Sequence, residues 1–453
     1  MSLILQECKK TMHLAWPMVI SQLTGVAMGT IDTIMVGQLG TKELAAMAMA
    51  NSLLYFCFVF AFGVLNALSP LVSERFGSRD LHQIPPLVRQ GMRIAILFSV
   101  FSIVLFFFSR TLFVWMHQQA DLIELGHQYL QYISIGMPAL FLFLTLRIFM
   151  EAVSDPKPSM YATLIGICLN IVFNQIFIYG YLGFPAMGVA GSGLATSMVY
   201  ICMFLFLLVY IETSKTYESM RILVGPFATD WNRIKMIFQI GLPFGLSWTL
   251  EIAFFIYTCL MVGSLGHMQL AAHQISINFC ATVFMLCAGT ALAVSVQIGQ
   301  DRGRGDWHLI RLHAWIGYLV VVAVGLLFMF VIFQFPEFII GIYTKDIELT
   351  KITIPIVLIG AWFLITDGAQ SIGMNILKGL KDTTTPLINS LIAFWIIGAP
   401  LCYYLCFVQE MEEAGVWWGM VVSLCLAAVF HLIRFLWVTK NSHMKEYKKT
   451  QAT

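Results

Sequence analysis

Charged side chains are scarce in this sequence. Only 11% of its 453 residues are Asp, Glu, Lys or Arg, whereas 59% are hydrophobic and the mean hydropathy is +0.82. Soluble domains carry about 25% charged residues, so this composition excludes a soluble globular protein. It indicates a chain that lies mostly within a lipid bilayer.

Catalytic and metal-binding motifs are also missing. The sequence contains no HExxH, no GxSxG and no GxxxxGK[ST] phosphate loop, the patterns that mark metalloproteases, serine hydrolases and ATP-binding domains. Its ten cysteines are scattered and form no CxxC pair, and such cysteines behave as small apolar residues when buried. We therefore expect neither an enzyme nor an ATP-driven pump, and neither a cofactor nor a nucleic-acid partner.

Long apolar stretches fill most of the chain. A spanning helix needs about 20 mostly apolar residues, and the uncharged runs between Lys157 and Glu212 and between Glu251 and Asp301 are each long enough for two. We expect an all-α integral membrane protein with twelve transmembrane helices. The predicted spans are 14–38, 47–73, 93–116, 126–151, 160–182, 190–212, 236–262, 271–300, 310–334, 352–378, 385–407 and 414–438.

Lys and Arg are unequally distributed between the two sides of this predicted topology. With the N-terminus in the cytoplasm, only four of the 26 lie on the far side: Lys42, Arg110, Lys345 and Lys351. Because these residues concentrate in cytoplasmic loops, both termini are predicted to be cytoplasmic. No cleavable signal peptide is evident before the first span. The short tails favour a multi-pass protein of a plasma membrane, the bacterial inner membrane.

The two halves of the sequence repeat each other. One register aligns Pro17 with Pro243, Met35-Val36-Gly37 with Met261-Val262-Gly263, and Leu39-Gly40 with Leu265-Gly266. The repeat covers an even number of spans, so both halves have the same orientation in the membrane. We expect two six-helix lobes, 1–212 and 236–440, joined by a cytoplasmic linker at 213–235 and followed by a cytoplasmic tail at 441–453. Transporters built from parallel repeats alternate access by rocking one bundle against the other.

Three acids lie inside the predicted spans: Asp32, Glu251 and Asp367. A charged side chain at the bilayer centre costs about 2.5 to 15 kcal/mol, depending on the measure. Such residues therefore face a cavity, titrate or bind a cation. The repeat does not duplicate them, because Asp32 aligns with Thr258 and Glu251 aligns with Gly25. The helical framework therefore derives from the duplication, whereas the three acids do not belong to the repeated pattern.

Glu251 and Asp367 are predicted to meet within the C-terminal lobe. Burial and like charge both disfavour two ionised carboxylates, so such a pair favours binding a proton. With hydroxyl or carbonyl oxygens added, the same pair could hold Na⁺, and the sequence leaves H⁺ and Na⁺ open as the coupling ion. We expect no other metal. Asp32 lies near the end of the first span, and the sequence is compatible with either an ion-binding or a structural role for it.

Polar and aromatic side chains near the acids are candidate ligands for an ion or a cationic substrate. Asn170 and Asn174 share one face of the fifth span, where they could contact an ion or hydrogen-bond a neighbouring helix. An aromatic ring can hold an organic cation by a cation–π contact. The rings close to the C-terminal acids are Phe254, Phe255, Tyr257, Trp362 and Phe363.

Longer motifs surround several of these residues. They are Ile31-Asp-Thr-Ile-Met-Val-Gly-Gln-Leu-Gly40, Asn170-Ile-Val-Phe-Asn174, Leu270-Ala-Ala-His-Gln274 and Lys378-Gly-Leu-Lys-Asp382. Over essentially its whole length the chain resembles the multidrug and toxic compound extrusion (MATE) family, NorM-like branch. The resemblance implies that Glu251 and Asp367 couple the ion in the C-terminal lobe and that Asp32 is the acid of the N-terminal lobe. Some other branches carry a second acid near the position of Asn174, where this chain has an amide.

The predicted function is secondary active multidrug export, in which a monomer in the lipid bilayer exchanges small organic cations for Na⁺ or H⁺ by alternating access. The alternative is a lipid or lipid-linked saccharide flippase of related two-lobed architecture. A flippase needs basic residues for phosphate groups, and only Arg147 approaches the membrane interior. Glu151 lies one turn away and is expected to pair with it. Because the predicted spans contain several acids and few bases, the sequence favours a cationic cargo over a phosphate-bearing one.

Overall fold

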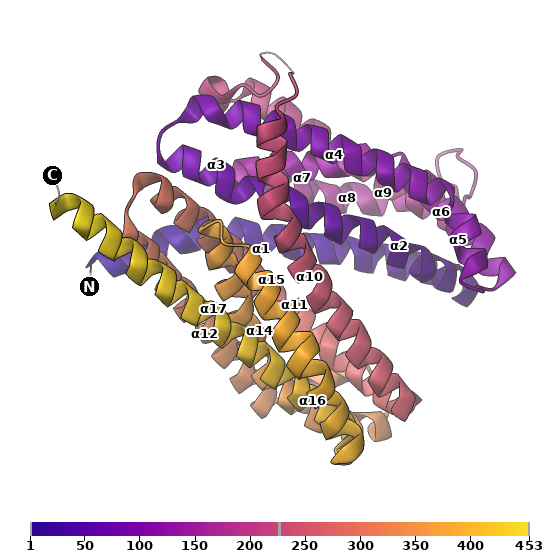
Figure 1. The fold of residues 1–453 in the computed structure, drawn as a ribbon. Helices are drawn as coiled ribbons and strands as arrows, with labels where there is room; N and C mark the ends of the chain where they lie inside the picture. The colour runs from indigo at the N-terminus through magenta and orange to yellow at the C-terminus, as the bar shows by residue number, and fades with distance from the viewer. Residues whose placement is uncertain (1, 225–227, 452–453) are drawn as a thin grey trace. The chain divides into compact units, whose positions relative to one another are not determined.

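The protein is built from helices. A computed structural model describes residues 2–224 and 228–451, and every regular element in these ranges is helical (Figure 1). Among the described residues, eleven helical stretches are long and apolar enough to cross a membrane, and one bent helix pair supplies a twelfth crossing. The all-α, twelve-span architecture predicted from the sequence is confirmed.

The chain divides into two compact units, one of Ile20–Gly241 and one of Met1–Val19 together with Leu242–Thr453. The divisions fall inside α1 (Ser2–Gly37) and α10 (Trp231–Leu265), close to an internal proline in each, Pro17 and Pro243. A proline inside a helix removes one backbone hydrogen bond and crowds the preceding turn. The unit boundaries thus follow the two repeated prolines, whereas the sequence-based lobes were 1–212 and 236–440.

The Ile20–Gly241 unit holds the site around Asp32. After the rest of α1 it contains α2 (Thr41–Leu65), α3 (Leu68–Gly77), η1 (Leu81–Gln83), α4 (Ile84–Phe107), α5 (Ser109–Trp115), α6 (Ala120–Ser134), α7 (Met137–Ala152), α8 (Lys157–Tyr179), α9 (Val189–Thr213) and η2 (Lys215–Met220). Helix α9 packs against α6, α7 and α8. Glycine permits the close approach at residue 136, because a Cβ there would lie 2.6 Å from the Cα atom of Ser197, and the backbone N–H of Gly136 donates to Ser197 Oγ at 3.0 Å.

The bent pair consists of α6 and α7, which meet at 52°. Pro138 is the second residue of α7, a position at which a missing backbone N–H leaves no helical hydrogen bond unmade. Further inside a helix the same proline would break the hydrogen-bond ladder, so the chain ends one helix at Ser134 and begins another. The fourth predicted span, 126–151, is therefore a broken helix.

The other unit holds Glu251 and Asp367. Besides the start of α1 and most of α10, it contains α11 (His267–Arg304), α12 (Trp307–Gln334), α13 (Pro336–Gly341), α14 (Ile347–Gly379), α15 (Thr384–Ser390), the π-helix η3 (Leu391–Gly398), α16 (Ala399–Tyr403), the π-helix η4 (Tyr404–Val408) and α17 (Glu412–Gln451). Helix α14 packs against α11, α12 and α17. It is the central helix of this unit, and its buried face carries Asp367.

The sequence repeat is visible in the backbone conformation. Gly40 and Gly266, at matched positions, precede α2 and α11 with φ angles of 151° and 150°. Residues with a Cβ atom rarely adopt this conformation, whereas glycine adopts it readily. A Cβ on either glycine would lie 2.6 Å from the side-chain oxygen of Glu43 or Gln269. The same turn was kept in both copies.

The predicted inter-lobe linker, 213–235, is anchored rather than free. Residues 225–227 of this segment, and the last two residues of the predicted tail at 441–453, lie outside the described residues. Tyr217 of η2 is fully buried, and its hydroxyl donates to Asp155 Oδ2 at 2.9 Å. Burial and the neighbouring Asp155 carboxylate raise the pKa of Tyr217, so the hydroxyl remains a donor at neutral pH. The start of this segment belongs to the packed unit.

Replacing Gly191 with Ala is expected to lower the thermal midpoint of the purified protein. The added Cβ would overlap the backbone carbonyl of Phe177, which cannot rotate away as a flexible side chain can. Overpacking costs about 1–3 kcal/mol. Gly25→Ala is the matched control, because nothing lies within 4 Å of its Cβ position. Equal midpoints for the two variants would contradict the packing of α8 against α9.

Candidate functional site

Asp32 is held by a cage of polar side chains. It is 8% exposed, and its carboxylate accepts hydrogen bonds from Asn170 Nδ2 at 2.9 Å, Asn174 Nδ2 at 2.6 Å and Thr196 Oγ1 at 3.2 Å. The two asparagines lie one turn apart on α8 and therefore point the same way, while Thr196 comes from α9. The structure brings all three N-terminal candidates together and adds Thr196.

The oxygen atoms of this cage suit a small hard cation. Asn174 Oδ1 is buried without a hydrogen-bond partner, and Asn170 Oδ1 accepts one bond, from Asn174, at 3.3 Å. Carboxylate, amide and hydroxyl oxygens are the ligands that hard cations prefer. Rotation of the amides would exchange the hydrogen bonds to Asp32 for contacts to such an ion. Among the described residues, no group of three or more His, Cys, Asp or Glu forms a conventional metal site.

The cage is positioned by a second contact between α1 and α8. Tyr179 Oη lies 2.8 Å from the backbone oxygen of Met35 and 2.9 Å from Gln38 Oε1. Met35 follows Asp32 by about one helical turn, so this contact fixes the spacing of the two helices beside the carboxylate. Helices α1 and α8 therefore hold the Asp32 carboxylate in a fixed position relative to the two asparagines.

Glu251 and Asp367 meet between α10 and α14. Glu251 is half-buried, and its Oε2 accepts a hydrogen bond from Gln370 Nε2 at 3.2 Å. Gln370 follows Asp367 on α14 by about one turn. Asp367 is 5% exposed and interacts electrostatically with Glu251. The structure thus brings the two C-terminal acids together, with Gln370 as a third member that the sequence prediction missed.

Two oxygen atoms at this place are buried without a protein partner among the described residues: Asp367 Oδ1 and Gln370 Oε1. A buried polar atom left unpaired costs about 1–3 kcal/mol, and two neighbouring carboxylates cannot both stay ionised in an apolar site without a cation or a proton. A proton on Asp367 would convert one oxygen into a donor. A Na⁺ ion would instead use the oxygens of Glu251, Asp367 and Gln370.

Four of the aromatic candidates near these acids belong to one packed cluster: Phe254, Phe255, Tyr257 and Phe363. Phe254 stacks on Phe394 with ring centroids 5.3 Å apart, and Phe363 contacts Phe255 at 5.9 Å and Trp417 at 5.5 Å. Phe254 is 0% and Phe363 is 2% exposed. These two rings fill the core of the unit, while Phe255, which is half-buried, lies at its edge.

Tyr257 lies at the edge of the same cluster, whereas Trp362 lies outside it. Tyr257 packs against Trp395 at 6.1 Å and is half-buried. Trp362 is 48% exposed, whereas Asp367 on the same helix is buried, so the two side chains leave α14 on different sides. The structure does not bring Trp362 together with the acids.

Arg147, the base that approaches the membrane interior, is paired with a carboxylate and an amide. Its Nε donates to Glu151 Oε1 at 2.7 Å and its guanidinium also donates to Gln22 Oε1 at 2.7 Å. The predicted pairing with Glu151 is confirmed, although the pair is buried rather than at a helix surface: Arg147 is 8% and Glu151 is 6% exposed. Its charge is balanced by a carboxylate within the same unit.

A buried ionic cluster that sequence reasoning missed links α1, α11 and α12. His313 Nδ1 lies 2.5 Å from Asp301 Oδ2, and its Nε2 lies 3.2 Å from Glu7 Oε2. All three residues are at most 7% exposed. Lys10 pairs with Glu7 at 2.7 Å, and Arg304 pairs with Asp301 at 3.0 Å. Carboxylates accept hydrogen bonds, and each ring nitrogen of His313 faces one carboxylate oxygen.

Comparisons with known proteins agree over nearly the whole chain. The MatE family model matches residues 17–176 and 243–404, one stretch in each half. The chain is 34% identical over 444 residues to the multidrug resistance protein MdtK of Yersinia enterocolitica, covering 96% of both chains. It is 31% identical over 431 residues to the probable multidrug resistance protein NorM of Chromobacterium violaceum, covering 94% of this chain and 93% of that protein.

Solved structures share the fold. An outward-facing multidrug resistance MATE family transporter matches with a TM-score of 0.89 at 19% identity, over 96% of this chain and 97% of that one. The eukaryotic MATE transporter AtDTX14 matches with a TM-score of 0.84 at 19% identity, over 98% of this chain and 99% of that one. At these identities the likeness establishes the architecture alone.

Proposed function

The chain belongs to the MATE family of transporters, and from this premise we propose that it is a secondary active multidrug exporter. It exchanges cationic amphipathic compounds for Na⁺ or H⁺ by alternating access, as a monomer in a bacterial inner membrane with both termini in the cytoplasm. The names of its MdtK and NorM relatives support the multidrug assignment. The distribution of Lys and Arg supports the orientation.

The observation that carries this proposal is a set of mid-span acids, Asp32, Glu251 and Asp367, that have no basic partner among the residues that the structure describes. Asp32 and Asp367 are 8% and 5% exposed, and the side chains that donate hydrogen bonds to Asp32 and Glu251 are amides and a hydroxyl. Carboxylates in the membrane interior are retained where they bind ions or substrates. Carboxylates attract cations, so both the ion and the exported compound carry positive charge.

The same argument disfavours a flippase. A phosphate-bearing cargo requires unengaged basic groups inside the membrane. Arg147 is buried against Glu151 and Gln22, and this arrangement leaves its charge neutralised. A cavity-facing phosphate site would need a different base.

Exchange follows from competition for charge. In the outward-facing state, Na⁺ or H⁺ neutralises Glu251 and Asp367 and displaces the bound organic cation, which leaves to the outside. After the lobes rock, the ion is released to the cytoplasm and the carboxylates attract the next compound. A ligand shifts a conformational equilibrium only as far as its affinities for the two states differ, so the coupling requires ion and drug to prefer opposite states.

Gradient-driven efflux tests this function directly. Proteoliposomes carrying the protein and ethidium are given an inward Na⁺ gradient or an inward pH gradient in turn. We expect one of the two gradients to drive dye export and dissipating it to stop export. Absence of export under both gradients by inserted, folded protein would overturn the multidrug proposal.

The Asp32 cage predicts a stabilising effect of Na⁺. If the cage binds the ion, Na⁺ at about 100 times its dissociation constant stabilises the folded protein by about 2.7 kcal/mol, which appears as a raised thermal midpoint. Thr196→Val and Asn174→Leu each remove one oxygen and keep the number of heavy atoms in the side chain, and both should reduce this shift. Asn278→Leu, at an exposed position of α11, is the control. An unchanged Na⁺ shift in both cage variants would assign the cage a purely structural role.

A further inference from the structure

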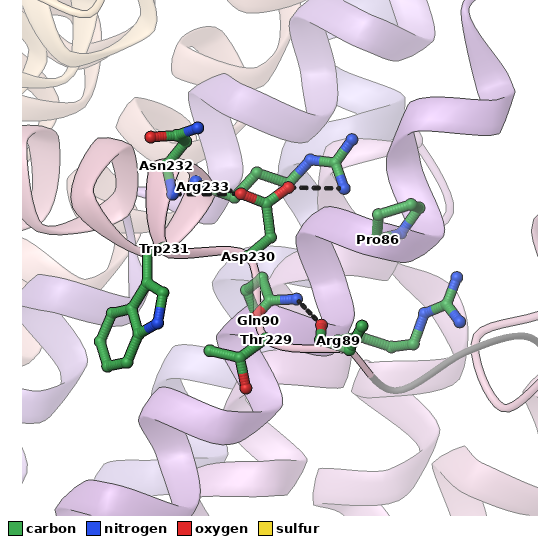
Figure 2. A pocket seen from close by; sticks show the side chains of 9 residues that line it. Pro86, Arg89, Gln90, Thr229, Asp230, Trp231, Asn232 and Arg233 are labelled. Carbon is green, nitrogen blue, oxygen red and sulfur yellow. Dashed lines mark hydrogen bonds and ion pairs between the residues drawn. The ribbon is translucent and has the colours of Figure 1, made fainter.

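A pocket of about 500 Å³ lies at the beginning of α4 and α10 (Figure 2). Within a single unit, the first turns of α4 contribute Pro86, Arg89 and Gln90, and the segment 228–233 contributes the rest of the wall. The membrane-spanning stretches begin at Leu81 and Trp231. The pocket therefore lies at the level where the spans end, and the exchange of drug for ion makes no use of it.

Two arginines from different segments line this pocket. Figure 2 shows their guanidinium groups on either side of Pro86. Arg89 is 7% exposed, and its Nε donates to the backbone oxygen of Pro85 at 3.3 Å, which fixes its position. Arg233 contacts Asp230 Oδ2 at 3.2 Å and donates to Gln83 Oε1 at 2.8 Å. A guanidinium has five N–H donors, so Arg233 retains donors for a ligand.

The acid in the wall is already engaged. Asp230 Oδ1 accepts hydrogen bonds from the backbone N–H groups of Asn232 at 3.1 Å and Arg233 at 3.2 Å, and its Oδ2 pairs with the Arg233 guanidinium. Its charge is thus balanced by that guanidinium and by the partial positive charge at the start of α10. Gln90 Nε2 donates to the backbone oxygen of Ala228 at 3.1 Å and ties the segment to α4. The wall is fixed, and its lining contains two arginines and one acid.

We propose that this pocket binds the phosphate of an anionic lipid headgroup. Arginine recognises phosphate through paired N–H donors, and basic pockets at the ends of transmembrane helices bind such headgroups. Trp231 on the rim is 75% exposed and points away from the arginines (Figure 2), and tryptophan is enriched at the headgroup level. A water molecule occupies about 30 Å³ in the liquid, so the pocket has room for glycerol beside the phosphate.

The test is a titration of the purified protein in neutral detergent with short-chain phosphatidylglycerol. We expect saturable binding whose dissociation constant rises about 10-fold or more in Arg233→Gln and in Arg89→Gln, because each loses a charged hydrogen-bond donor to phosphate. Arg221→Gln removes the same charge from an arginine whose side chain is 52% exposed, and it should leave binding unchanged. Equal affinity in all three variants would overturn the proposal.

A third variant keeps the test informative if an arginine variant fails to fold. Asn232→Asp adds a negative charge to the exposed wall of the pocket, at a helix N-terminus where an acid favours folding, and it should weaken phosphatidylglycerol binding by a similar factor. Phosphatidylcholine has the same phosphate without net charge and should bind more weakly. Equal binding of phosphatidylcholine would overturn the anionic preference. Inorganic phosphate that binds as tightly, with the same dependence on Arg233, would assign the pocket to a soluble anion instead of a lipid.

Discussion

Asp367→Asn and Glu251→Gln are each expected to lower gradient-driven ethidium efflux about 100-fold or more. Each substitution keeps the shape of the side chain but removes its ability to release a proton or to balance a cation. A hydrogen bond or contact to a charged group contributes up to about 3 kcal/mol, which corresponds to about two powers of ten in affinity. Because Glu251 and Asp367 interact electrostatically, either loss changes the charge of the whole site.

Controls separate this effect from misfolding. Glu348→Gln neutralises an exposed acid in the first turn of the same helix as Asp367 and should leave efflux unchanged. Asp367→Glu restores the carboxylate and should recover part of the activity. All variants are measured at equal amounts of monodisperse protein. Efflux at the wild-type rate in Asp367→Asn would remove this residue from the coupling mechanism.

Replacing His313 with Ala is expected to destabilise the protein by about 3–5 kcal/mol, the cost of breaking a buried ion pair by removing one partner. The imidazole lies between Asp301 and Glu7, and without it two buried carboxylates lose their shared donor. Lys10 and Arg304, each at least half exposed, approach from the outside and cannot fill the gap. The measurement is the thermal midpoint of the purified protein in detergent.

Removing the remaining charges should recover part of this loss. In the triple variant Glu7→Gln, Asp301→Asn, His313→Leu no unpaired carboxylate remains, and replacing a whole buried ionic group by neutral residues is often close to neutral in stability. The triple variant is therefore expected to melt at a higher temperature than His313→Ala. A triple variant that melts lower than the single one would show that the three residues act independently.

The architecture could be predicted from the sequence because apolar length and the repeat determine it. The spans follow from the cost of leaving backbone polar groups unpaired in lipid, and the aligned prolines at residues 17 and 243 mark both copies. The break between α6 and α7 was only partly visible, because Pro138 signals an interruption but not its angle. The division of the chain at Val19 could not be anticipated, because it depends on tertiary packing of a continuous helix.

The charged residues of the candidate site could be predicted from the sequence. An acid in mid-span stands out because it is costly there, and this identified Asp32, Glu251 and Asp367. Gln370 and Thr196 escaped prediction because neutral polar groups are tolerated in spans, although a glutamine one turn after a buried acid was an available signal. The Glu7, Asp301 and His313 cluster lies near the ends of spans, where charged residues are common.

The aromatic residues show that spacing along the sequence does not predict which side chains lie near the acids. Trp362 and Phe363 are neighbours, yet one is 48% and the other 2% exposed. Proximity to an acid in the sequence does not give the direction in which a side chain leaves its helix, and direction decides between core, lipid and cavity. Only the packing of α14 against its neighbours resolves it.

The central claim is that ion and drug compete for the same carboxylates, and ion displacement measures this most directly. Purified protein in weakly buffered detergent is loaded with radioactive Na⁺ in one arm and observed with a pH-sensitive dye in the other, and a saturating organic cation is then added. Wild type should release Na⁺ or protons in proportion to the cation bound, and the double variant Glu251→Gln, Asp367→Asn should release neither. Binding of the organic cation to wild type without release of either ion would contradict the account.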